Sequence, residues 1–487
     1  MSLFIKKPLS QLMSQTGGNS DKELKRTLGP GNLIALGIGA IIGAGLFVRT
    51  AAAAGEAAGP AVVISFIIAG LGCAFAGLCY AEFASMIPVA GSAYTYAYVT
   101  MGEFIAWIIG WALILEYALA AATVAIGWTE YLNNLLVAYD LSAIPYEWSH
   151  SPLETSLTGV QGMVNIPALF ILLILTLILI KGTQESATVN AVIVVIKVGI
   201  VLLFIAIGWQ FINPANYDPF MIPEGTPGHE ASNQHGWGGV FRGAAIVFFA
   251  FIGFDAVSTA AQEAKNPKRD MPIGILGSLV ICTVLFVLFA YVLTGVANWQ
   301  EFKTAGKEAS VAYAIQTYMH GYGWLGKLIT LAILAGFSSV ILVMLMGQSR
   351  VFYTMSKDGL IPKVFSDIHP KFRTPYKSNM ILFVFVGIFA GFIPGSMAGD
   401  LTSIGTLFAF VMVCAGVWVM RVKNPEAVRP FKTPLVPIVP ILGMLLCAYM
   451  IFSLPEETLL LAAFWMVIGL VIYFTYSKKN STLRKTE

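Results

Sequence analysis

Residues 37–48 read GIGAIIGAGLFV, and this stretch places four glycines within nine residues of an otherwise apolar segment. Each glycine costs roughly 1 kcal/mol relative to alanine in a helix interior, so the first apolar run of the chain is easiest to unwind here. Gly39 and Gly43 also form a GxxxG pair, which is a common contact surface between membrane helices. Two interpretations follow from the residues alone: close helix packing, or a break in the helix.

The composition places the whole chain in a membrane. Of its 487 residues, 57% are hydrophobic and 11% are charged, and the mean hydropathy is +0.77, which is too apolar for one soluble core. A helix needs about 20 mostly apolar residues to cross a bilayer. Runs of this kind lie at 32–54, 61–87, 103–128, 165–181, 187–212, 239–261, 272–297, 326–354, 378–394, 401–420, 435–454 and 458–476. We therefore expect an all-α membrane protein with twelve transmembrane helices.

The charge distribution predicts the orientation. The first 30 residues are polar, carry several basic side chains and contain no cleavable signal peptide. With twelve spans, most of the 29 Lys and Arg residues fall on the same side as this segment, which predicts that both termini are cytoplasmic in a plasma (inner) membrane protein. The net charge of +3 then reflects membrane topology and lipid headgroups, and no nucleic-acid partner is expected.

The sequence offers no pattern typical of an enzyme. All five cysteines fall inside predicted spans, all five histidines fall in predicted loops, and neither set has the spacing of metal ligands. No nucleophile elbow or phosphate loop is present. We therefore expect no metal, no cofactor and no enzymatic activity. A channel is an alternative, although rings of pore-lining charge and a repeated filter sequence are missing.

A helix break inside a membrane points to a transporter. Unwound backbone is tolerated at membrane depth only where protein or a water-filled cavity receives its polar groups. Freed amides suit a carboxylate and freed carbonyls suit an ammonium group. Five spans later, residues 248–259 (FFAFIGFDAVST) contain Gly253 and Asp255 in mid-span. This spacing predicts two inverted five-helix repeats. The predicted domains are a tail at 1–31, repeats at 32–212 and 239–421, two further spans within 435–476, and a tail at 477–487.

Lys197 is the most informative ionisable residue. It lies in NAVIVVIKVGIVLLF (190–204), about ten residues and roughly 15 Å into the fifth span, where snorkelling to the surface is difficult. Intramembrane ionisable residues usually serve function. Because burial disfavours the charged form, such a lysine can gain and lose a proton near neutral pH. The alternative is a structural partner for a buried acid.

Four stretches together resemble the amino acid–polyamine–organocation transporter superfamily. They are GIGAIIGAGLFV at 37–48, CYAEFASMIPVAGSAYTYAYVTMGEF at 79–104, FFAFIGFDAVSTAAQEAKNPKRDMPIGI at 248–275 and SRVFYTMSKDGLIPKVFSDIHPKFRTP at 349–375. The stretch GEFIAWIIGWALILEYALAAATVAIGW (102–128) is similar to the third span of its cationic amino-acid transporter branch. With twelve predicted spans, the chain looks like a shorter, bacterial-type homologue of that branch. The resemblance implies a LeuT-type fold and transport of an amino acid by alternating access.

The resemblance also implies roles for individual residues. It places carboxylate-binding amides at Gly43, Ala44 and Gly45 in the first broken helix. It places the carbonyls that would meet the ammonium group at Ile41, Phe249, Ala250 and Ile252. In proton-coupled relatives a lysine of the fifth span occupies the sodium position, which favours a coupling role for Lys197. The expected acceptors for its ammonium group are carbonyls near Gly39 and the hydroxyl of Ser338 or Ser339.

Several roles stay open from the sequence. Glu116, halfway along the third span, either receives a cationic substrate side chain or belongs to a structural hydrogen-bond network. Asp255 either contributes to the substrate site or binds amides freed by the second break. Arg49 is either a gate or an interface anchor, and Phe249 or Phe254 could form a lid. We expect a proton-coupled importer of L-amino acids that are small and neutral, like alanine, or cationic, like arginine and lysine. The alternative is an amino-acid exchanger without net proton coupling.

Overall fold

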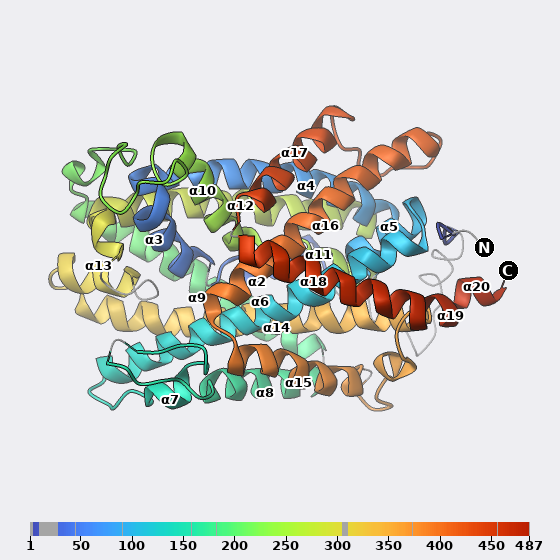
Figure 1. Ribbon diagram of the computed structural model, residues 1–487, viewed down its shortest axis with the longest axis horizontal. Helices are drawn as coiled ribbons and strands as arrows, with labels where there is room; N and C mark the ends of the chain where they lie inside the picture. The colour runs from blue at the N-terminus through green and yellow to red at the C-terminus, as the bar shows by residue number, and fades with distance from the viewer. Residues whose placement is uncertain are drawn as a thin grey trace.

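The computed structural model describes residues 3–8, 28–43, 45–89, 91–156, 158–181, 183–303, 310–372, 374–454 and 456–486. Within these ranges the chain is helical and forms no strand, although isolated backbone bridges occur, as between Leu28 and Ala264. Figure 1 shows long helices running along the long axis of the molecule, with both termini at the same end. We call this the termini end, and the opposite end the far end.

Helices cover each apolar run predicted in the first half of the chain. They are α2 (Pro30–Ile41), η1 (Gly45–Arg49), α3 (Thr50–Ala53), η2 (Ala54–Ala58), η3 (Gly59–Ala61), α4 (Val62–Met86), α5 (Ser92–Thr100), α6 (Glu103–Ala138), α7 (Tyr146–Ser149), α8 (Ile166–Lys181) and α9 (Thr183–Gly208). Short 3₁₀ turns, η4 (Trp209–Phe211) and η5 (Pro214–Tyr217), follow α9.

The second half is covered in the same way. Its elements are α10 (Gly236–Phe248), η6 (Phe249–Phe251), α11 (Ala256–Thr259), η7 (Ala261–Glu263), α12 (Pro267–Val296), η8 (Trp299–Lys303), α13 (Ser310–Tyr318), α14 (Gly323–Lys357), η9 (Lys363–Ser366), α15 (Tyr376–Phe392), α16 (Gly395–Lys423), α17 (Ile438–Phe452), α18 (Glu456–Ile472), η10 (Tyr473–Ser477), α19 (Lys478–Asn480) and α20 (Thr482–Thr486).

Length and hydropathy make this a polytopic membrane protein. Eight helical stretches of the described residues are long and apolar enough to cross a bilayer. The helices α2, α8, α15 and α17 are apolar but have only 12, 16, 17 and 15 residues. At a rise of 1.5 Å per residue, α8 spans about 24 Å, somewhat less than a hydrocarbon core of about 30 Å. The twelve-span count therefore stays a prediction.

The central helix α6 is longer than the sequence indicated. The third apolar run was predicted to end at residue 128, whereas α6 continues to Ala138. Residues 129–138 extend this helix, and tertiary contacts, which a hydropathy pattern does not reveal, hold them in place. Thr129 is buried and donates a hydrogen bond to Asn165 Oδ1 at 2.7 Å, which joins α6 to the start of α8.

Small residues let the central helices approach one another closely. The α6 helix packs along α14 and α16, and α12 packs along α2 and α4. The buried face of α6 includes consecutive alanines at 120–122. Because lipid tails are as apolar as the side chains, helix association in a membrane depends on close packing of such small residues. This packing fixes the two interrupted helices against α14.

The two terminal segments bind the helix ends at the termini end. Glu103, the first residue of α6, is fully buried and accepts a hydrogen bond from Arg484 Nε at 2.6 Å. The Nζ atom of Lys7 lies 2.6 Å from Oδ1 of Asp358, just after α14. We call these four residues the terminal clamp. Backbone bonds reinforce it, since the amide of Glu103 donates to a carbonyl within residues 3–8.

The clamp predicts a large effect of Glu103→Gln on stability. This change removes the carboxylate that Arg484 Nε binds at 2.6 Å, and breaking a buried ion pair by removing one partner costs about 3–5 kcal/mol. We expect a clearly lower melting temperature of the purified protein in detergent. The matched control is Lys377→Gln, which removes an exposed ion pair with Asp367 and should leave the melting temperature unchanged. Equal melting temperatures for wild type and Glu103→Gln would contradict the clamp.

Candidate functional site

The first helix is interrupted within the glycine-rich stretch. The helix α2 ends at Ile41, and Ile42 is extended, with φ −75° and ψ 106°. Helical geometry resumes at Gly45 as a π-helical turn, η1. Ala44, one of the predicted substrate-binding residues, lies outside the described residues. The break predicted from the glycines is therefore present, and it leaves main-chain polar groups free in mid-bundle.

The second interrupted helix has its break around Gly253. After α10 and the short 3₁₀ turn η6, Ile252 turns to ψ 132° and Gly253 adopts φ +111°. Side chains other than glycine rarely adopt this conformation. A Cβ atom on Gly253 would also lie 2.9 Å from the Cβ of Ala40. Glycine is required at this position for both reasons, and the helix resumes only at α11.

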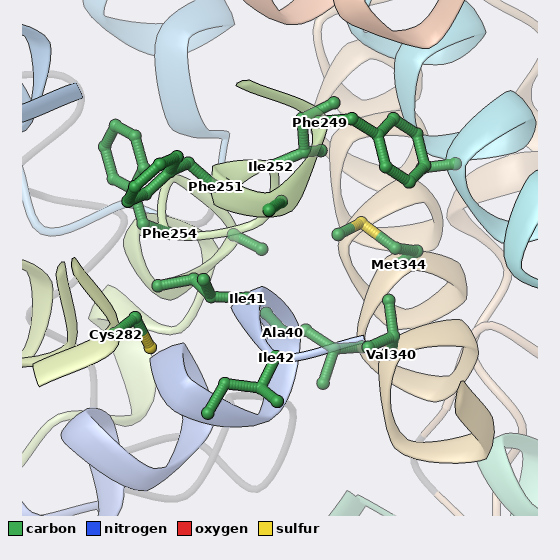
Figure 2. Close-up of a cluster of buried hydrophobic side chains, with 14 of the residues drawn as sticks. Ala40, Ile41, Ile42, Phe249, Phe251, Ile252, Phe254, Cys282, Val340 and Met344 are labelled. Atoms are coloured by element: carbon green, nitrogen blue, oxygen red, sulfur yellow. The ribbon is translucent and has the colours of Figure 1, made fainter. Parts of the chain in front are cut away.

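The two breaks touch each other. A Cβ atom placed on Gly45 would lie 2.2 Å from the Cα of Ala250, which is closer than any real contact. Figure 2 shows apolar side chains around this junction: the end of α2, the turn at Phe249 and Ile252, and Val340 and Met344 of α14. Since these side chains carry no polar groups apart from thioether sulfur, the polar character of the junction comes from the backbone.

The glycines of the first stretch also serve helix packing. A Cβ atom on Gly37 would lie 2.3 Å from Ser278 Oγ of α12, and one on Gly39 would lie 2.7 Å from the Asn190 amide of α9. Both interpretations of the sequence are therefore right. Gly37 and Gly39 permit close packing, whereas Gly43 and Gly45 border the break and also lie in close contact, with Val340 of α14 and with Ala250.

Lys197 binds the end of the first half-helix. Its side chain is 1% exposed, and Nζ donates to the carbonyls of Gly39 at 2.6 Å and Ile42 at 2.8 Å. Ser339 of α14 donates to the same Gly39 carbonyl at 3.4 Å. The lysine therefore donates hydrogen bonds to carbonyls that the break has freed, and it connects α9 to α2.

Two details at Lys197 differ from the prediction or go beyond it. Ser338 does not take part, because its hydroxyl donates to Leu334 within α14 at 2.9 Å. Asn190, which was not predicted, accepts a hydrogen bond from Ser339. The signal that could have found Asn190 is its position seven residues before Lys197, two helical turns away on the same face of α9.

Two buried acids lie beside the second break. The hydroxyl of Tyr117 donates to Asp255 Oδ2 at 2.6 Å, so this carboxyl group binds a phenol of α6 through that oxygen. Among the described residues, Asp255 Oδ1 and both carboxyl oxygens of Glu116 have no hydrogen-bond partner. The backbone of Glu116 faces α16, where a Cβ on Gly405 would lie 3.1 Å from the Glu116 Cβ. The two acids are close enough to interact electrostatically.

On the far side of the junction, Arg49 bridges three elements. Its guanidinium lies 3.7 Å from Asp400 of α16, and its Cζ lies 5.4 Å from the centre of the Phe249 ring. A cation over an aromatic face at this distance is attractive. Arg49 thus closes the space between η1, η6 and α16, and Phe249 covers the junction from that side.

The chain matches the amino acid permease family over residues 28–476. It belongs to this family. It is 43% identical to the branched-chain amino acid permease BcaP of Bacillus subtilis (strain 168) over 99% of both chains. It is 41% identical to the methylthioribose transporter of the same organism over 99% of this chain and 100% of that protein. It is also 34% identical to the vacuolar cationic amino acid transporter 4 of Arabidopsis thaliana, over 83% of this chain and 65% of that protein.

Membership in this family confirms the resemblance to the amino acid–polyamine–organocation superfamily. The family is that of amino acid permeases, which agrees with the eight helical stretches of the described residues that are long and apolar enough to cross a membrane. The expectation that the permease is no enzyme is consistent with such a family. The individual roles of the junction residues, in contrast, stay predictions.

The contact between the breaks predicts that Gly45→Ala abolishes uptake by the permease. The added methyl group would meet the Ala250 backbone, so the two half-helices must move apart. The matched control is Gly199→Ala in α9, where a Cβ would meet nothing within 4 Å. We expect the control to retain full uptake, because Ala favours a helix by roughly 1 kcal/mol over Gly. Radiolabelled amino-acid uptake, normalised to membrane expression, distinguishes the two; wild-type uptake by Gly45→Ala would contradict the assignment.

Proposed function

We propose that this permease is a proton-coupled importer of neutral L-amino acids that works by alternating access. In this proposal it lies in the plasma membrane, with the termini end in the cytoplasm. The observation that carries the proposal is the contact between two helix breaks in mid-bundle. Such a junction presents amides and carbonyls together, and a zwitterion requires both.

The binding mode follows from the backbone. The amides at Gly43 and Gly45, with Ala44 between them, would hold the substrate carboxylate at the start of the second half-helix. Carbonyls of Ile41, Phe249, Ala250 and Ile252 would receive the ammonium group. Lys197 already occupies the carbonyls of Gly39 and Ile42, which leaves the ammonium group to the remaining ones.

The apolar walls favour a neutral side chain. Val340 and Met344 of α14 and Phe249 surround the junction. Glu116, the acid that could have received a cationic side chain, starts from a backbone that faces Gly405 of α16. The relatives named for branched-chain amino acids agree with an apolar pocket, whereas those named for cationic amino acids or methylthioribose would need a polar one. We therefore place alanine and the larger aliphatic amino acids before arginine and lysine.

Symmetry in the helix contacts supports the two inverted repeats. If α2 to α9 and α10 to α16 are equivalent repeats, then contacts should occur in matching pairs. The contact of α2 with α12 has its counterpart in α10 with α4, and that of α6 with α16 has its counterpart in α14 with α9. The pairs α4 with α12 and α6 with α14 are their own counterparts. We propose the 5+5 arrangement on this basis, with α17 and α18 added.

Lys197 is the proposed coupling residue. In its charged form it holds the end of α2 through two carbonyls. On losing a proton the ammonium group would become a neutral amine with one N–H donor fewer. Its attraction to these carbonyls would therefore weaken. The end of α2 would then be held less firmly against α9. Arg49, Phe249 and Asp400 would close the opposite side of the site.

The coupling role predicts a specific defect in Lys197→Gln. In proteoliposomes with an inward proton gradient, wild type should accumulate substrate above equilibrium, whereas the variant should only equilibrate it. Counterflow in the absence of a gradient should persist, because the backbone site is intact. The control is Lys181→Gln at the exposed end of α8, which should accumulate substrate normally. A variant that responds to the proton gradient like wild type would refute the role of Lys197.

Substrate class and coupling can be tested together in the same proteoliposomes. We expect L-leucine and L-alanine uptake to rise several-fold with an inward proton gradient, and L-arginine uptake to be at least tenfold lower. Preference for arginine would instead support the interpretation that Glu116 receives a cationic substrate side chain. Uptake that ignores the gradient but requires internal amino acid would favour the exchanger alternative.

A further inference from the structure

A small cavity with several polar residues in its lining lies between the junction and the termini end. It has a volume of about 30 Å³ and lies between α2, α9, η7 and α14. Its polar lining residues are Asn32, Asn190, Glu263 and Arg350. Arg350 follows Val340 by ten residues on α14, which places it about 15 Å from the junction along the helix. A solute that leaves the junction along α14 towards the termini end meets this cavity.

Only one of the two terminal nitrogens of Arg350 has a hydrogen-bond partner among the described residues. It is 7% exposed, and its Nη2 donates to Oε1 of Glu263, which is 8% exposed. Among the described residues, its Nη1 has no hydrogen-bond partner. A buried donor without a partner costs about 1–3 kcal/mol, and more when it is charged. Such an atom in a native structure points to an absent ligand or to an ordered water.

Another buried arginine of the same protein shows what a purely structural role looks like. Arg429 donates through Nε to Glu82 and through both terminal nitrogens to main-chain carbonyls, including those of Met420 and Asn424. Every nitrogen of its guanidinium therefore has a partner. Arg350 differs from it in retaining a free donor beside a cavity, and structural support for η7 does not require that donor.

We propose that this cavity is an exit subsite for the zwitterionic substrate, with Arg350 binding its carboxylate and Glu263 its ammonium group. The inference rests on the proposed amino-acid transport. Guanidinium groups match carboxylates in a planar, two-bond geometry, so the free Nη1 supplies the second bond of such a pair. The charges of Arg350 and Glu263 together mirror those of an α-amino acid.

The subsite is closed in this conformation. A volume of about 30 Å³ holds about two water molecules and no amino acid. A backbone bridge from Leu28 to Ala264 ties the start of α2 to the segment after η7. To open the cavity, α2 must move away from that segment. The α2 helix has 12 residues and is separated from η1 by the break, so it can swing as a unit. Opening would then widen the cavity while the Arg350 and Glu263 pair exchanges partners with the substrate.

The test compares the two faces of the membrane. In inside-out vesicles the cytoplasmic face is outside, and in right-side-out vesicles it is inside. For L-leucine or L-alanine, Arg350→Gln and Glu263→Gln should raise the half-saturation concentration at least fivefold in inside-out vesicles and less than twofold in right-side-out vesicles. Arg350→Lys keeps the charge and loses the planar geometry, so it should give a smaller rise on the same face. This conservative variant also provides the readout if Arg350→Gln does not fold.

The control is Arg421→Gln, which removes the two-bond contact between Arg421 and Glu82. It should lower the amount of folded protein without a change confined to one face. A symmetric change in Arg350→Gln, like that of the control, would overturn the subsite. So would an effect that disappears when chloride in the vesicle buffers is replaced by gluconate, because the ligand would then be an inorganic anion. Absence of amino-acid uptake by wild type in both orientations would instead reject the proposed function itself.

Discussion

The structure depends on one constraint: backbone that leaves helical geometry inside a membrane must find partners within the protein. Two segments of this permease leave helical geometry at the same place, and they pack directly against each other. The carbonyls freed at Gly39 and Ile42 are received by Lys197. The chain around Gly253 packs directly on Ala40. If the junction is the substrate site, as proposed, its main-chain groups would recognise what all amino acids share, and specificity would depend on the apolar side chains around it.

The glycine cluster at residues 37–45 meets two opposing requirements of the first half-helix. In the proposed cycle the first half-helix moves, which requires it to be short and weakly attached, yet in lipid helices associate largely through close packing. Gly37 provides the close contact, with α12 at Ser278. The break after Ile41 limits the half-helix to 12 residues. Polar contacts hold it at both ends, at Lys197 and at the Leu28 bridge.

The breaks and the buried lysine could be predicted because their signals are local. Glycine lowers helix stability at any interior position. An ammonium group in mid-span must face the protein interior and find a hydrogen-bond partner there. Which neighbour it meets depends on helix phase: Ser338 and Ser339 are adjacent in sequence, but successive helical residues point about 100° apart, and only Ser339 faces α2. The terminal clamp joins Glu103 to Arg484, far apart in the chain, so no sequence pattern indicates it. The place of α6 relative to α16 likewise decides where Glu116 points.

Some buried polar groups of the described residues have several partners, whereas others keep an unpaired atom. At the helix ends, Glu103 and Glu82 collect several donors each, and these networks hold fixed loops and tails in place. Between the junction and the termini end, Glu116, Asp255 and Arg350 each keep a buried atom without a partner among the described residues. Unpaired groups are costly in one conformation, but they lower the cost of a second one in which they are paired. In the proposed transport cycle, a conformation that pairs Glu116, Asp255 and Arg350 would be stabilised relative to this one.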